Sequence, residues 1–181
     1  MTAPTLTELE SRCLEAFPTW LRTLGDDARA LAALVESGDT AAPVRRKAAA
    51  ALNYLLRSLD LIPDGIEDLG FIDDAFVFRV AAAGQAADAA DPVLARLAGE
   101  AGLIRELLED DYARLETYVA GLGSAPSRGR TVDDILGDAA VTAEFVRDIR
   151  GWADAYSSPT FQRDAKNLVK LKSFLSAKLP K

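Results

Sequence analysis

The chain of 181 residues contains no histidine and a single cysteine, Cys13. Histidine is the usual base that activates a serine or cysteine nucleophile, and it is the commonest protein ligand of transition metals. One cysteine cannot form an intrachain disulfide or a thiolate zinc cluster. These absences leave carboxylates, lysine, tyrosine and serine for any catalysis. They leave Mg²⁺ or Ca²⁺ as the metal ions that the available oxygen ligands favour.

Long apolar segments are also lacking. No run approaches the roughly 18 uncharged residues that a transmembrane helix needs, and residues 1–10 have neither a basic start nor a hydrophobic signal core. With 49% hydrophobic and 27% charged residues, the composition is typical of a folded chain and not of a disordered one. We expect a cytoplasmic protein with one domain, residues 1–181, that is neither secreted nor transmembrane.

Positive charge is scarce outside the C-terminal segment. The net charge is −7, whereas binding to nucleic acid needs a basic face that neutralises phosphates, so no nucleic-acid partner is expected. Residues 159–181 contain six basic residues and one acidic residue, a net charge of +5. The rest of the chain contains 15 basic and 27 acidic residues, a net charge of −12. This asymmetry predicts an acidic body with a basic end helix.

The alternating β-branched pattern of strands is absent, whereas apolar residues recur every three or four positions. The sequence therefore predicts an all-α protein, a compact bundle of about six to eight helices. One helix, marked by Ile72, Phe76, Val80 and Ala83, is apolar on nearly all sides, which places it at the centre of the bundle. The predicted helices span residues 5–25, 26–36, 43–59, 72–83, 92–122, 131–157 and 159–181.

Local signals set the ends of these helices. Thr5 and Glu8 form a capping-box pattern at the first helix, and Pro18 is expected to kink or break that helix. Residues 121–130 are rich in Gly, Ser and Pro, which predicts a flexible linker to a C-terminal helical pair, residues 131–181.

Residues 60–74, DLIPDGIEDLGFIDD, contain six acids between two strongly apolar segments. Pro63 and Gly70 indicate a turn-rich connector between two buried helices. Carboxylates that are held close to a core need hydrogen-bond or charge partners. The connector is therefore the first candidate for a functional site.

The run DLIPD, Gly70 and the pair Asp73 and Asp74 resemble the motif of the bacterial YkvA-like family, which is catalogued as a domain of unknown function. The resemblance implies a small helical module, residues 28–90 of this chain, and no established activity. Everything after about residue 90 lies outside it.

Two interpretations of the acidic connector remain open. In the first, which we favour, the carboxylates cap helix ends, Asp73 capping the helix that follows it, and any that remain buried pair with arginines. The candidate partners are Arg45, Arg46, Arg57 and Arg79. In the second, the carboxylates bind Mg²⁺ or Ca²⁺, and a water activated by that metal makes the chain a metal-dependent enzyme. The candidate ligands are Asp60, Asp64, Asp73 and Asp74.

The last predicted helix is amphipathic, with Leu168, Leu171 and Leu175 on its apolar stripe. It either packs on the bundle and turns a basic face to solvent, or it binds an anionic membrane surface or an acidic partner. The residues of this candidate surface are Arg163, Lys166, Lys170 and Lys181.

These observations predict a protein that acts by interaction or regulation, with a protein partner, and that has no enzymatic activity. No catalytic residue is assigned, and no cofactor apart from the Mg²⁺ or Ca²⁺ of the alternative. The two alternatives are a carboxylate-metal enzyme centred on residues 60–74 and peripheral membrane association through the basic C-terminal helix.

Overall fold

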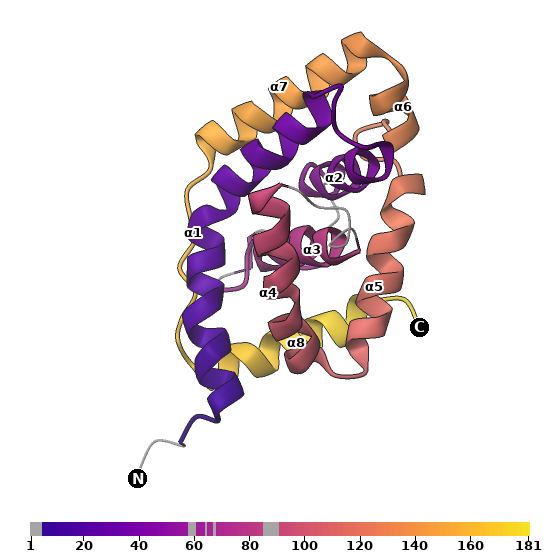
Figure 1. The fold of residues 1–181 in the computed structure, drawn as a ribbon. Helices are drawn as coiled ribbons and strands as arrows, with labels where there is room; N and C mark the ends of the chain where they lie inside the picture. Colours follow the sequence, from indigo (N-terminus) through magenta and orange to yellow (C-terminus); the bar gives the residue numbers. More distant parts are fainter. Residues whose placement is uncertain (1–4, 58–60, 64, 67, 85–90) are drawn as a thin grey trace.

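The computed structural model describes residues 5–57, 61–63, 65–66, 68–84 and 91–181. Over these ranges the chain forms eight α-helices, one 3₁₀-helix and no strand, which confirms the prediction of an all-α bundle. Figure 1 shows α2 and α3 enclosed by α1, α4 and α5, with α7 beside α1 and α8 at the lower end. The helices are α1 (Glu8–Glu36), α2 (Ala42–Leu55), α3 (Ile72–Ala83), α4 (Pro92–Leu108), α5 (Asp111–Gly121), η2 (Leu122–Ser124), α6 (Val132–Gly137), α7 (Ala139–Ala155) and α8 (Ala165–Lys178).

Helix α1 is longer than predicted. It continues through Pro18 and Gly25, so the expected break is wrong and the predicted helices 5–25 and 26–36 are one. Proline removes one backbone hydrogen bond and costs about 3 kcal/mol inside a helix. The burial of Phe17 and Trp20 on either side of it opposes that cost, because each large aromatic side chain stabilises the fold by a few kcal/mol.

The capping box of α1 lies two residues later than predicted. The Thr7 amide donates to Glu10 Oε2 (2.7 Å), and the Glu10 amide donates to Thr7 Oγ1 (3.1 Å). Thr5 and Glu8 show the same sequence pattern, since Thr-x-x-Glu occurs in both frames. The pattern therefore identifies the type of cap but not its position.

Helix α3 lies at the centre of the bundle, as predicted. Every residue from Ile72 to Ala82 is buried, and α1, α2, α4 and α5 all contact the helix. The Phe76 ring meets the rings of Phe17 and Trp20 edge to face, at 5.2 and 6.1 Å. The position of α3 is thus set by the four helices around it.

The predicted helix 92–122 is two helices, α4 and α5. The break is at Glu109, whose φ of 53° is incompatible with a continuing right-handed helix. The apolar periodicity continues across this break, which is why the pattern did not reveal it. Gly99 and Gly102 do not interrupt α4, although glycine weakens a helix interior.

The predicted helix 131–157 is also two helices, α6 and α7. Thr131 caps α6 in a capping box with Asp134. Asp138 caps α7 by accepting hydrogen bonds from the Ala140 and Val141 amides, at 2.8 and 3.3 Å. Since an aspartate is a strong N-cap, Asp138 starts a new helix where the pattern predicted a continuous one.

Helix α7 runs antiparallel to the C-terminal half of α1 (Figure 1). Arg29 pairs with Asp154 at 2.8 Å, and further along α1 Glu36 pairs with Arg150 at 2.6 Å. Where the two helices end their contact, a Cβ at Gly25 would lie 3.5 Å from the Tyr156 ring. A larger side chain than alanine there would separate α7 from α1.

The segment between α5 and α6 contacts α2. Ser127 and Arg130 exchange two backbone hydrogen bonds, and the Asn53 side-chain amide donates to the Arg130 carbonyl at 3.0 Å. Arg128 Nε donates to the Leu56 carbonyl at 3.2 Å. Flexibility of residues 121–130 stays a prediction, which these contacts do not test.

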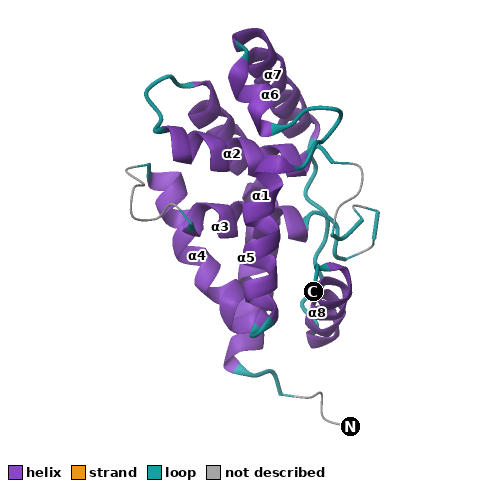
Figure 2. Cartoon of the chain, turned by 90° about the vertical axis from the view of Figure 1, so that its right-hand side faces the viewer, coloured by secondary structure: helices purple, strands orange, loops and turns teal. Residues whose placement is uncertain are grey.

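The last helix begins later than predicted. It starts at Ala165 with Asp164 as its N-cap and not at Ser158 or Pro159. Figure 2 shows α4 on the left and α8 at the lower right, and the two helices meet at the C-terminal end of α4, where Glu109 pairs with Lys172 at 3.6 Å.

We predict that Asp138→Ala lowers the free energy of unfolding by about 1 kcal/mol, because the first turn of α7 loses the acceptor of two amides. Urea denaturation followed by circular dichroism measures this change. Asp39→Ala is the matched control, since this exposed carboxylate accepts no hydrogen bond from the described residues. Equal losses in the two variants would show that Asp138 does not act as a cap.

Candidate functional site

The acidic connector joins the end of α2 to the start of α3, and Tyr54 is the centre of its described contacts. The Tyr54 hydroxyl donates to Asp73 Oδ2 at 2.5 Å and accepts from the Leu61 amide at 2.8 Å. The Ile62 amide also donates to Asp73 Oδ2, at 3.3 Å. One carboxylate and one phenol therefore hold the chain on both sides of the connector at a fixed distance.

The prediction that Asp73 caps α3 is wrong. The N-cap position is occupied by Phe71, which has a φ of 66°, and both Asp73 and Asp74 lie in the first turn. Negative charge is favourable there, because the helix dipole places positive potential at the N-terminus. The Asp73 carboxylate turns back to the connector instead of to the amides of its own helix.

Burial, together with the charges of Asp73 and Asp74, raises the pKa of Tyr54 far above the usual value of a phenol. The hydroxyl consequently keeps its proton and acts as a hydrogen-bond donor throughout the physiological range. A group with this property is suited to holding a carboxylate and not to serving as a general base.

The other predicted metal ligands, Asp60 and Asp64, lie outside the described residues. Among the residues that are described, no group of three or more Cys, Asp or Glu side chains is arranged to hold a metal ion. The metal hypothesis therefore stays a prediction. What the structure adds is that one oxygen of Asp73 already accepts two hydrogen bonds.

The described contacts of the four candidate arginine partners lie elsewhere. Arg45 donates to the Val35 carbonyl (2.7 Å), and Arg46 pairs with Asp133 (2.7 Å). Arg57 donates to the Tyr118 hydroxyl at 3.2 Å. The described hydrogen bonds of the Asp73 carboxylate come from the Tyr54 hydroxyl and the Ile62 amide.

Arg79, the fourth arginine, belongs to a buried charge cluster that the sequence analysis missed. Glu100 Oε2 lies 2.8 Å from both Nε and Nη2 of Arg79. Asp27 Oδ2 lies 3.9 Å from Arg79 Nη2, and Arg96 binds both Asp27 and Glu100. Two arginines and two carboxylates thus join α1, α3 and α4.

The Arg79 guanidinium is completely buried and lies over the Trp20 ring, 4.0 Å from the ring centroid. Burial lowers the pKa of Arg79 to about 10, and the charges of Glu100 and Asp27 oppose this shift. At neutral pH the group is charged, so its partners are needed to offset its desolvation. The sequence signal was the arginine inside the apolar run AFVFRVAAA, which requires acids on neighbouring helices.

The basic surface predicted on the last helix is exposed, and the apolar stripe of that helix is buried against the bundle. The Phe161 ring meets the Phe17 ring at 5.8 Å. Arg114 of α5 donates to the carbonyls of Ser176, Leu179 and Pro180 (2.5 to 3.1 Å), which holds the C-terminal end of α8. The apolar stripe of the last helix therefore packs on the bundle and its basic residues face solvent.

Arg163, Lys166, Lys170 and Lys181 are all exposed. No carboxylate among the described residues forms an ion pair with any of them, whereas Lys172, nearer the apolar side, pairs with Glu109 at 3.6 Å. Val169 is 63% exposed and lies on the same face as the two lysines of this group that lie on α8. On α8 itself the surface thus consists of Lys166 and Lys170 beside one exposed apolar side chain.

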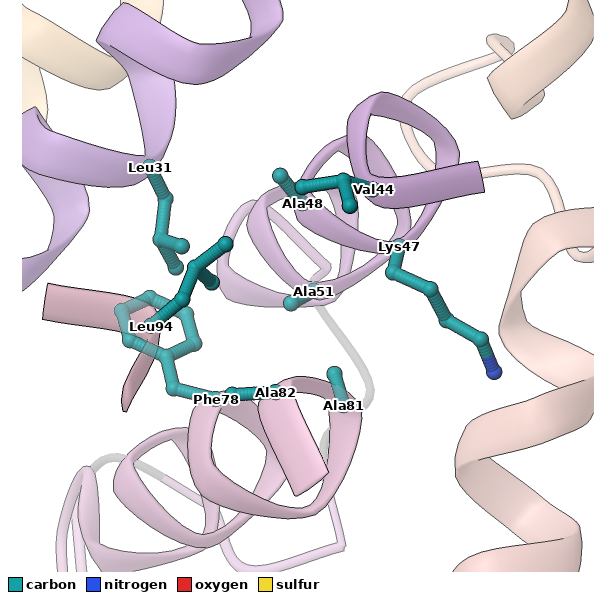
Figure 3. A pocket seen from close by; sticks show the side chains of 9 residues that line it. All are labelled: Leu31, Val44, Lys47, Ala48, Ala51, Phe78, Ala81, Ala82 and Leu94. Atoms are coloured by element: carbon teal, nitrogen blue, oxygen red, sulfur yellow. The ribbon is translucent and has the colours of Figure 1, made fainter. Parts of the chain in front are cut away.

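Figure 3 shows a cavity where α1, α2, α3 and α4 meet. Its volume is about 10 Å³, which is the space of one water molecule. Leu31, Phe78 and Leu94 form apolar walls, and the Lys47 ammonium points away from them (Figure 3). The cavity is too small for a substrate or cofactor.

Cys13 is completely buried. Burial raises the pKa of its thiol to about 11, so the thiolate is not populated at neutral pH. The cysteine consequently acts as a small apolar side chain in the core, and no nucleophilic role follows from it.

We predict that Tyr54→Phe lowers the free energy of unfolding by about 2 kcal/mol, because the buried Asp73 carboxylate and the Leu61 amide each lose a partner. Chemical denaturation measures the change. Tyr112→Phe is the control, since Tyr112 is buried too and its hydroxyl has no hydrogen bond within the described part of the chain. A loss of the same size in both variants would refute the role given to the Tyr54 hydroxyl.

We predict that Arg79→Leu lowers the free energy of unfolding by about 3–5 kcal/mol, because two buried or half-buried carboxylates lose their central cation. Thermal and urea denaturation both report this loss. Arg29→Leu removes an arginine that also binds two carboxylates but at the surface, and it should cost much less. A small effect of Arg79→Leu would mean that Arg96 alone neutralises the cluster.

Comparison with known proteins identifies one segment of the chain. No curated protein and no solved structure matches the chain. No helix of the described residues is long and apolar enough to cross a bilayer. Residues 44–79 match the model of a family described as "Protein of unknown function (DUF1232)". The matched segment includes most of α2, the connector and the first part of α3. This match confirms the resemblance inferred from the DLIPD motif.

Proposed function

We propose that this chain is a cytoplasmic interaction protein without enzymatic activity, and that it binds an acidic protein surface through the basic face of α8. We define this face by Lys166, Val169 and Lys170 of α8, together with Arg163, which lies just before the N-cap of the helix. The observation that supports it is the exposure of Val169 between cations that have no described carboxylate partner. Exposed charges that are not paired within the described part of the chain are available to a partner of opposite sign, and complementary charge steers such an encounter.

Helix geometry gathers these side chains on one side. Val169 and Lys170 follow Lys166 by three and four residues, so each is a neighbour of Lys166 on the helix surface. The rest of the body carries a net charge of −12. Since salt screens exposed charges beyond about 8 Å, the positive potential of α8 acts only on a partner that touches this helix.

The packing of α8 favours a protein partner over a membrane. Amphipathic helices bind a bilayer by inserting their apolar face. In α8 that face, formed by Leu168, Leu171 and Leu175, is buried in the bundle. Membrane binding would then depend on the basic residues alone, at about 1 kcal/mol each near an anionic surface. A folded acidic surface can instead contact both the cations and Val169.

We predict that the protein binds a fluorescent glutamate-rich peptide. Lys166→Glu with Lys170→Glu should weaken this binding about tenfold, since each lysine contributes roughly 1 kcal/mol. Fluorescence anisotropy measures it. The control is Arg22→Glu with Arg147→Glu, which changes the net charge equally at exposed positions outside α8.

The proposal fails if both double variants bind the peptide equally, because binding would then follow net charge alone. Co-sedimentation with phosphatidylserine vesicles separates the membrane alternative. Vesicle binding that Lys166→Glu with Lys170→Glu abolishes, without any binding to the peptide, would replace the protein partner by an anionic membrane.

A further inference from the structure

An open groove lies between α1 and α4. Its volume is about 580 Å³, and Ala16, Gly99 and Gly102 form much of its lining. Glutamates line it as well, and one of them, Glu106, pairs with Arg12 across the groove at 2.9 Å. Glu15 is exposed at the side of α1 and has no described ion pair. Trp20 and Leu103 are the large apolar residues of the lining, and three glutamates outnumber its one arginine, so the groove is open and acidic.

No contact with the described residues explains the two glycines. A Cβ at Gly99 or at Gly102 would meet no atom within 4 Å, although both lie inside α4. Each glycine in a helix interior costs about 0.5–1 kcal/mol relative to alanine. Packing against the described residues does not require them, and glycine leaves room for a second backbone close to α4.

We propose that this groove binds the basic face of α8 from a second copy of the chain. This inference rests on the function proposed for α8, and it identifies the acidic surface that α8 contacts. Val169 fits over the open surface at Gly99 and Gly102, and Lys166 and Lys170 then face the glutamates of the groove. The complementarity is between a segment of +5 and a body of −12.

The contact has to form between molecules. The apolar stripe of α8 is buried against its own bundle, and Arg114 holds the C-terminal end of this helix, so a chain cannot place its own α8 in its own groove. Such a contact joins two different surfaces, and it leaves one groove and one helix free in every dimer. One helix face buries less area than a stable interface needs, so the association is weak and sensitive to salt.

Sedimentation velocity over a concentration series tests this inference. For the unmodified chain we expect the average mass to rise with concentration at low salt and to fall at high salt. Lys166→Glu with Lys170→Glu removes the helix surface, and Gly99→Leu with Gly102→Leu fills the groove. Each variant should stay monomeric. An equimolar mixture of the two should form a heterodimer, because each keeps the surface that the other has lost.

Gly151→Leu is the matched control. Gly151 also lies inside a helix, a Cβ added there would meet no atom within 4 Å, and the residue is remote from the groove lining. This variant should self-associate like the unmodified chain. Circular dichroism melts show whether the variants are folded, and leucine favours helix at these positions.

The outcomes separate this inference from the proposed function. A chain that stays monomeric at all concentrations but binds the glutamate-rich peptide overturns the self-association and keeps the function of α8. Self-association that persists in Gly99→Leu with Gly102→Leu, or a mixture without heterodimer, overturns the groove as the binding site. A chain that does neither overturns both.

Discussion

The burial of ionised side chains on α3 is the constraint on which the rest of the structure depends. This helix is enclosed on all sides, yet Asp73 lies in its first turn and Arg79 two turns later. A buried charge without a partner costs several kcal/mol, so polar groups from the neighbouring helices have to meet each one. Tyr54 of α2 meets Asp73, and Asp27 of α1 and Glu100 of α4 meet Arg79.

These polar contacts specify how the helices are placed, whereas the apolar contacts supply most of the stability. Leucine and alanine side chains pack in many relative positions at similar free energy. The distance between the Tyr54 hydroxyl and Asp73, or between Arg79 and Glu100, is satisfied in only one arrangement. The family match ends at residue 79, so it contains Tyr54, Asp73 and Arg79, but Asp27 and Glu100 lie outside it.

Fold class, the central helix and the exposed basic face of the last helix followed from sequence periodicity, because burial and exposure repeat with the helix turn. Helix ends did not follow. The periodicity continues across Glu109 and Asp138, where a positive φ and a side-chain cap end the regular hydrogen bonding. Periodicity also cannot identify partners that are distant in sequence, which is why the Arg79 cluster and the contact of Tyr54 with Asp73 were missed.

The groove between α1 and α4 shares one residue with the buried cluster. Glu100 accepts a hydrogen bond from Arg79 and also lines the groove. A lysine that enters the groove adds a third cation near this carboxylate, which already pairs with Arg79 and Arg96. It cannot displace Arg79, whose guanidinium is completely buried and lies over Trp20. Occupation of the groove should therefore leave the arrangement of α1, α3 and α4 unchanged, since the same network that positions α3 also makes the groove rigid. A rigid groove loses little conformational entropy on binding, which favours even a small contact between two copies.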